Sequence, residues 1–234
     1  MRRLRFTLLG DGSSDEALIR HLDWLIRTYV SADVAVEAYW ADLRGVPSRP
    51  AGLKARMVAT LEFYPCELLF VHRDAEKEPP QNRVHEIEKA WTESACPGVC
   101  VPVIPVRMSE AWLLVEETAI RKASGNPNGM EPLDLPPIKE IERLIDPKNT
   151  LQQALRRASG LTGRRLKAFK PRPRLVAEYM ENFETLRALP AFVQLETSLR
   201  QVLSEMKLLG PGLEVRGKES SESEAQGKPG GKTQ

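Results

Sequence analysis

The sequence predicts an α/β protein built on a mostly parallel sheet with helices on both faces. Short apolar runs alternate with amphipathic helical stretches, strand then helix, four times up to about residue 127. The crossovers between them are short, and a strand–helix–strand crossover places the two strands parallel in one sheet. Acidic or glycine residues follow several of the predicted strands, at the edge where such folds keep their sites.

The first predicted strand, residues 6–9, ends at Gly10-Asp11-Gly12 and is followed by a helix over residues 13–30. Apolar side chains recur on this helix at helical spacing, so one face is expected to pack on the sheet. Ser13 or Ser14 is a suitable N-cap. The pattern therefore presents the Asp11 carboxylate at the carboxyl edge of the sheet.

The next elements follow the same alternation. We predict strands at residues 32–40, 67–71 and 99–106, and helices at 53–64, 83–94 and 111–124. Two prolines in the last strand indicate an edge position, because proline cannot donate to a strand ladder. His21 and Trp112 are interpreted as core residues.

Composition changes after Pro127. A turn-rich linker at 128–137 precedes helix-like pieces at 138–145, 151–159 and 174–186 and a last helix at 190–208. From Gly210 the chain is almost free of apolar residues, which predicts a disordered tail. The expected organisation is an α/β domain at 1–127, a helical, basic C-terminal portion at 128–209, and a tail at 210–234.

The overall composition is that of a soluble globular protein, with 41% hydrophobic and 28% charged residues and a formal net charge of only +2. No apolar run approaches the ~20 residues of a membrane span, and the start lacks a signal-peptide pattern. Cys66, Cys96 and Cys100 form neither a disulfide framework nor a complete metal motif, so reduced thiols are expected. We predict a cytoplasmic protein without a membrane partner.

Carboxylates follow three of the predicted strands: Asp11, the pair Asp74 and Glu76, and Glu110. Parallel strands end at one edge, so these side chains can converge although they are distant in sequence. Mg²⁺ (or Mn²⁺) prefers a few carboxylate oxygens and leaves room for a phosphate. The alternative is a set of solvated loop acids, and for Glu110 an acid placed favourably at a helix start.

These segments resemble the Toprim (topoisomerase-primase) superfamily. The resemblance is carried by Gly10-Asp11-Gly12-x-x-Asp15-Glu16 before a helix and by Asp74-x-Glu76 after a later strand. The stretches 107–114, 146–148 and 189–192 resemble a poorly characterised bacterial branch, often encoded beside ABC-type ATPases in gene clusters suggestive of phage defence. Asp11 stands where the family usually has Glu, and Glu76 where it has a second Asp. His72 and Asp74 form an alternative register.

The resemblance implies a Mg²⁺-dependent nuclease that cleaves nucleic-acid phosphodiesters and works with an ABC-type ATPase partner. It implies that Asp74 and Glu76 hold the metal, that Asp11 is a general base or second ligand, and that Glu110 completes the cluster. The alternative is a non-catalytic nucleic-acid-binding or regulatory subunit with an eroded metal site. A small-molecule phosphohydrolase using the same carboxylates is a third hypothesis.

A second feature is a stretch without acids between residues 148 and 177. A near-neutral chain that concentrates its cations in this way favours contact with phosphates, although a solvated face balanced by acids elsewhere would look the same. The basic residues are Lys148, Arg156, Arg157, Arg164, Arg165, Lys167, Lys170, Arg172 and Arg174.

Overall fold

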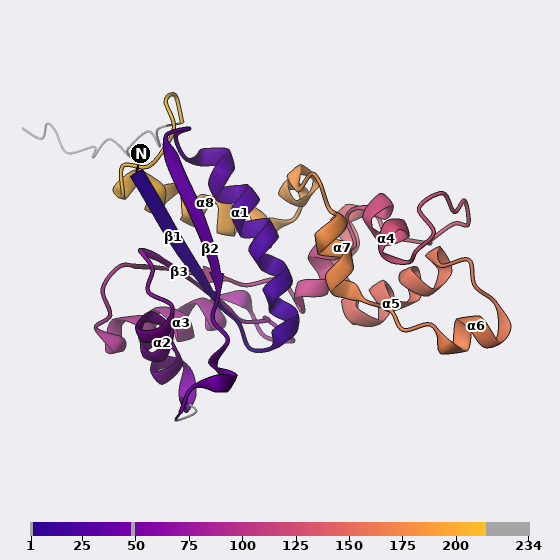
Figure 1. The fold of residues 1–234 in the computed structure, drawn as a ribbon, viewed down its shortest axis with the longest axis horizontal. Coiled ribbons are helices and arrows are strands. Elements are labelled where there is room, and N and C mark those ends of the chain that lie inside the picture. Colours follow the sequence, from indigo (N-terminus) through magenta and orange to yellow (C-terminus); the bar gives the residue numbers. More distant parts are fainter. Residues whose placement is uncertain (1, 48–49, 214–234) are drawn as a thin grey trace, which may run out of the picture.

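The computed structural model describes residues 2–47 and 50–213 and contains a four-stranded, all-parallel sheet in the order β2-β1-β3-β4 (Figure 1). The predicted α/β class is confirmed, and so is the edge position of the proline-containing strand. The strands are β1 (Arg2–Leu9), β2 (Val34–Trp40), β3 (Leu68–His72) and β4 (Val99–Val103).

Helices cover both faces of the sheet. On one face, Leu4, Phe6 and Leu8 of β1 pack with α1 (Leu18–Tyr29) and α8 (Pro190–Glu205). Alternate strand residues point to the opposite face, where the buried core includes residues of α2 (Gly52–Phe63) and α3 (Pro80–Ser94).

The chain leaves β1 toward β2 on one side and leaves β3 toward β4 on the other. The carboxyl ends of β1 and β3 therefore form a topological switch point, the usual position of a binding crevice in an open α/β sheet. β1 and β3 pair with Leu9 opposite Val71, so the loops that follow them start side by side.

The predicted helical C-terminal portion is present. It contains α5 (Pro147–Ala158), α6 (Gly163–Ala168) and α7 (Pro173–Tyr179), which extend away from the sheet, and α8, which returns to it (Figure 1). A single buried cluster extends from β1 to Leu208 and so includes residues of both predicted portions. The boundary at residue 127 stays a prediction.

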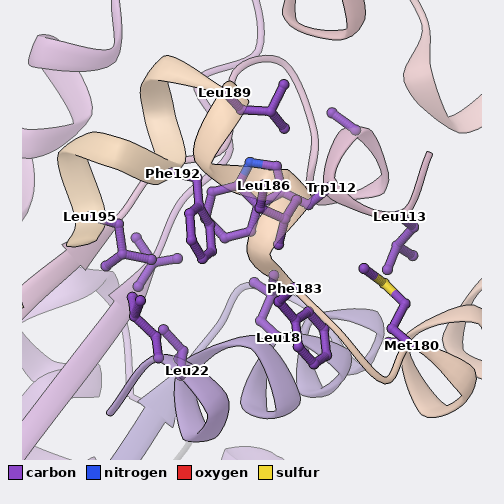
Figure 2. Close-up of a cluster of buried hydrophobic side chains, with 14 of the residues drawn as sticks. Leu18, Leu22, Trp112, Leu113, Met180, Phe183, Leu186, Leu189, Phe192 and Leu195 are labelled. Atoms are coloured by element: carbon purple, nitrogen blue, oxygen red, sulfur yellow. The ribbon is translucent and has the colours of Figure 1, made fainter. Parts of the chain in front are cut away.

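The centre of this cluster joins three parts of the chain (Figure 2). Trp112 is fully buried, and its ring lies 5.3 Å from that of Phe192 in an edge-to-face arrangement. Leu18 and Leu22 of α1 and Phe183 pack in the same cluster. The interpretation of Trp112 as a core residue is confirmed.

Several predicted boundaries are wrong. β1 begins at Arg2, and β4 ends at Val103, with a bend in the chain at residues 106–107. The predicted first helix begins as a 3-10 turn, η1 (Ser13–Ala17), and the piece predicted at 138–145 is the 3-10 helix η4 (Ile138–Arg143).

Two other predicted helices are interrupted. The helix predicted at 111–124 is the 3-10 helix η3 (Ser109–Leu113) followed by α4 (Glu117–Ala123). The helix predicted at 174–186 is α7 followed by η5 (Glu184–Ala188). Between them, the Asn182 side chain accepts a hydrogen bond from the Glu184 N–H at 2.8 Å, and this local bond begins a new turn.

The start of the predicted tail is ordered: the Gly210 N–H donates to the Tyr29 carbonyl at 2.8 Å. Residues 214–234, the rest of that predicted tail, lie outside the described residues. In the described part of the chain, no helix has both the length and the apolar character needed to cross a bilayer.

Candidate functional site

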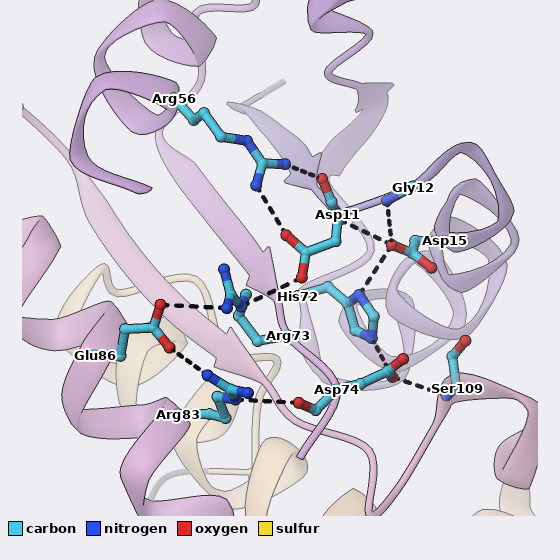
Figure 3. A network of polar contacts seen from close by, with 11 residues as sticks. Asp11, Gly12, Asp15, Arg56, His72, Arg73, Asp74, Arg83, Glu86 and Ser109 are labelled. Carbon is cyan, nitrogen blue, oxygen red and sulfur yellow. Dashed lines mark hydrogen bonds and ion pairs between the residues drawn. The ribbon is translucent and has the colours of Figure 1, made fainter. Parts of the chain in front are cut away.

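The loops after β1 and β3 place a polar network at the topological switch point (Figure 3). Asp11 lies in the glycine turn after β1, and Asp74 lies two residues beyond the end of β3. The start of η3 joins them, because the Ser109 N–H donates to Asp74 Oδ1 at 3.0 Å. Three segments distant in sequence thus meet at one edge of the sheet.

A buried histidine lies at the centre of the network. His72 is the last residue of β3 and is 1% exposed. Its Nε2 lies 3.2 Å from Asp74 Oδ1, and its Nδ1 lies 3.2 Å from Asp15 Oδ2, at ion-pair distance but without hydrogen-bond geometry. Burial favours the neutral ring, but the two carboxylates outweigh it and raise the pKa of His72 to about 9. The ring is therefore an imidazolium at neutral pH.

Asp15 shapes the glycine turn. Its Oδ2 accepts hydrogen bonds from the backbone N–H groups of Asp11 and Gly12, both at 2.9 Å. Burial raises the pKa of this carboxyl, but His72 and the two backbone donors together hold it below its usual value. A Cβ at Gly10 would lie 2.7 Å from the Asp15 Cβ, so glycine is required there by close approach. Asp15 is thus a site residue, whereas the sequence analysis named it only as part of the glycine-turn motif and gave it no role in the site.

Asp11 is held by two arginines. Its Oδ1 lies 2.8 Å from Arg56 Nη1, and its Oδ2 lies 3.2 Å from Arg73 Nε. Arg73 also pairs with Glu86 at 3.3 Å, and Glu86 pairs with Arg83 at 3.0 Å. Sequence reasoning missed all three arginines. Arg73 follows a strand directly and so carried a positional signal, whereas Arg56 and Arg83 lie on helices where nothing in the sequence distinguishes them.

Glu110 and Glu76 differ in their placement. Glu110 is half-buried, and burial raises its pKa; Asp74 and Asp15 act in the same direction, while Lys148 acts against them. Glu76 is exposed in a left-handed turn with φ of 53°, and its N–H donates to the Arg107 carbonyl at 3.1 Å. Its carboxylate makes no hydrogen bond or ion pair with any of the described residues.

The residues around the site determine whether it could hold a divalent cation. In residues 2–47 and 50–213, no three His, Cys, Asp or Glu side chains stand ready to ligate a metal. Asp15 and Asp74 nevertheless lie on either side of the His72 ring, and burial, with a smaller effect of these two acids, raises the pKa of the nearby Glu110 carboxyl. This oxygen-rich donor set suits Mg²⁺ or Mn²⁺ in chemistry. The Asp11 oxygens are already occupied by guanidinium groups.

The predicted basic residues lie on α5, α6, α7 and their connections. Arg157 pairs with Asp134, and Arg174 pairs with Glu178 at 3.2 Å and with Glu16 of η1 at 2.7 Å. The Glu16 contact brings the end of the basic stretch against the helix that follows the Asp11 turn. Exposed cations without an ion pair to any described residue are Arg164, Arg165, Lys167, Lys170 and Arg172.

Arg156 and Lys148 complete the basic stretch. Arg156 is half-buried and donates to the Leu166 carbonyl at 3.3 Å, which ties α5 to α6. Lys148 is exposed and near enough to Glu110 to influence its pKa. The basic stretch therefore begins, as well as ends, near the carboxylate edge.

The three cysteines are free thiols, as predicted, and all are partly buried. Burial raises the pKa of Cys66 and raises that of Cys100 to about 12, so both remain protonated at neutral pH. A protonated thiol is a poor nucleophile and metal ligand.

Comparison with protein-family models, with curated proteins and with solved structures gives no match to this chain.

Proposed function

We propose that the protein is a Mg²⁺- or Mn²⁺-dependent, Toprim-like nuclease that hydrolyses nucleic-acid phosphodiesters. The observation that carries the proposal is that Asp15 and Asp74 both lie 3.2 Å from His72 at the topological switch point between β1 and β3, with Glu110 next to Ser109, whose N–H donates to Asp74. Asp74 and Glu110 belong to the set predicted from the sequence, and we propose Asp15 as a ligand in place of the exposed Glu76. These three carboxylates would hold the cation.

The metal, when bound, supplies electrostatic stabilisation of the charge that develops on the phosphoryl oxygens. The chain's own residues orient the site. His72 lies between Asp15 and Asp74 and fixes both carboxylates, and the Ser109 N–H donates to the same Asp74 oxygen that His72 contacts. Arg56 and Arg73 both pair with Asp11 and hold its carboxylate beside the site.

The basic stretch supports a polymeric substrate. The exposed cations on α6 and in the loop after it form a basic surface longer than a single phosphate can contact. This length disfavours the small-molecule phosphohydrolase. The proposal includes the cytoplasmic location expected from the sequence and, through the resemblance described above, an ABC-type ATPase partner in a defence-type complex.

The second candidate is a non-catalytic nucleic-acid-binding or regulatory subunit. It is favoured by one specific observation: the carboxylates are already paired with protein cations. Asp11 has two guanidinium partners, and the His72 imidazolium lies between Asp15 and Asp74. An eroded metal site that persists as an ion-pair network would look like this.

The test compares cleavage of supercoiled plasmid and single-stranded RNA by wild type, Asp74→Asn and Asp33→Asn, with Mg²⁺, Mn²⁺ or EDTA. Asp33 is an exposed acid in the turn before β2, and its substitution is the matched control. We expect metal-dependent cleavage that Asp74→Asn abolishes and Asp33→Asn retains. Salt-dependent binding without cleavage would favour the second candidate, and neither cleavage nor binding would exclude both.

A further inference from the structure

A cavity of about 320 Å³ lies next to the carboxylate site, between the carboxyl ends of β1 and β2. Its lining includes Gly10, Asp11, Trp40, Leu43, Arg44 and Arg56. Asp74 and Glu110 do not line it, so it is a neighbour of the proposed metal site and shares only the Asp11 turn with it. Its volume is at the lower end of the range of small-ligand sites and suits a single ring system.

The cavity has an aromatic wall. Trp40 is the last residue of β2 and is half-buried, with its indole against Gly10, where a Cβ would lie 2.8 Å from the Trp40 Cη2. Leu43 adds an aliphatic surface. A half-buried indole lining a cavity of this size can serve as a stacking platform for a planar ring.

The polar groups of the cavity come in balanced pairs. Arg56 pairs with Asp11 at 2.8 Å, and Arg44 pairs with Asp42, which also lines the cavity, at 2.7 Å. The two pairs have no net charge but offer both hydrogen-bond donors and acceptors. That suits a neutral heteroaromatic ring with its own donors and acceptors better than a free phosphate.

We propose that this cavity holds one unpaired nucleobase of the substrate, stacked on Trp40 beside the proposed metal site. This inference rests on the proposed function, from which it takes that the substrate is nucleic acid. It adds that the bound part of the substrate is single-stranded or unpaired. A paired base cannot enter the cavity without leaving its stack. The preferred substrate is therefore a single strand or an unpaired region.

The test measures binding in EDTA, so that it does not depend on cleavage. The probe is a single-stranded oligonucleotide that contains 2-aminopurine, compared with the same strand in a duplex. We expect tighter binding of the single strand and quenching of 2-aminopurine fluorescence on binding. Trp40→Leu should weaken single-strand binding about tenfold, remove the quenching and leave duplex binding unchanged.

Two variants serve as controls. Trp40→Phe keeps an aromatic platform and should retain most of the binding, and Trp91→Leu removes a half-buried tryptophan on α3 away from the cavity and should have no effect. If Trp40→Leu does not fold, the base site is tested with the wild-type protein alone, by its relative affinity for single strand and duplex and by the quenching of 2-aminopurine. Equal affinity for both forms, or binding without quenching, would overturn the base site.

The result separates the two proposals. Single-strand binding and quenching without metal-dependent cleavage would leave the base site standing and remove the nuclease. Cleavage with equal binding of single strand and duplex would keep the nuclease and remove the base site. Absence of any nucleic-acid binding would overturn both.

Discussion

His21 is a buried, neutral histidine inside an aromatic cluster. Its ring centroid lies 4.7 Å from that of Phe183 and 5.9 Å from that of Trp112, and its Nδ1–H donates to the Ala17 carbonyl at 3.3 Å. Burial lowers its pKa from 6.5 to about 4. The prediction of a core histidine is confirmed.

This histidine should make the protein sensitive to acid. The unfolded chain binds a proton at His21 near pH 6.5, whereas the folded protein does so only near pH 4, so stability falls as pH falls through that window. Relative to His21→Leu, wild type should lose about 2 kcal/mol of unfolding free energy between about pH 7 and pH 4.5. Urea unfolding of both proteins at the two pH values measures this difference. Parallel curves would contradict the assigned shift.

Gly10 should tolerate no side chain. A Cβ there would lie 2.7 Å from the Asp15 Cβ and 2.8 Å from the Trp40 ring, and Asp15 is fixed by backbone donors. We expect Gly10→Ala to destabilise the fold by about 1–3 kcal/mol. Gly12→Ala, whose nearest contact would be Ser14 Oγ at 3.8 Å, is the control and should be nearly neutral. Thermal unfolding distinguishes them, and equal melting temperatures would refute the crowding argument.

At the scale of single residues, the sequence predicted which acids lie at the carboxyl ends of the strands, but not which cations pair with them. Asp11 and Asp74 follow strands, and strand ends converge in a parallel sheet. The partners of Asp11 come from α2 and from the residue after β3, and the packing of a helix on a sheet decides which arginine reaches which acid. Glu76 shows the same limit, because its left-handed backbone conformation places it in an exposed turn.

At the scale of elements, the strands and their order in the chain were predictable, because buried parallel strands are short apolar runs with distinct ends. The edge position of β4 was predictable from Pro102 and Pro105. The breaks between η3 and α4 and between α7 and η5 were not. A local side-chain bond such as that of Asn182 determines where one helix ends and the next begins.

The short helix α6 carries the prediction for nucleic-acid binding. We expect the triple variant Arg164→Gln, Arg165→Gln, Lys167→Gln to weaken binding and to reduce the slope of log affinity against log salt by about one for each phosphate that the variant no longer neutralises. Arg3→Gln, near the amino end of β1 and highly exposed, is the charge control and should change neither the affinity nor the slope. Fluorescence anisotropy at several salt concentrations measures the slope. An unchanged slope in the triple variant would exclude α6 from the interface.

At the scale of the whole molecule, α8 connects the helical portion to the sheet. Phe192 is fully buried against Trp112, whereas its neighbour Val193 is 42% exposed. Phe192→Ala should lower the unfolding free energy by about 3–5 kcal/mol, and Val193→Ala should change it by less than about 0.5 kcal/mol. Chemical denaturation of both variants gives the comparison. A small effect of Phe192→Ala would mean that α8 is not part of the cooperative core.

The C-terminal end of α8 meets the beginning of β1 (Figure 1). Arg2 donates to the carbonyls of Lys207 at 2.9 Å and Met206 at 2.7 Å, and Leu209 forms a bridge with Val30. The path of the described chain is therefore nearly a closed ring. Joining residue 213 to residue 2 and opening the chain at the 90% exposed Met130 would give a circular permutant with every strand pairing intact.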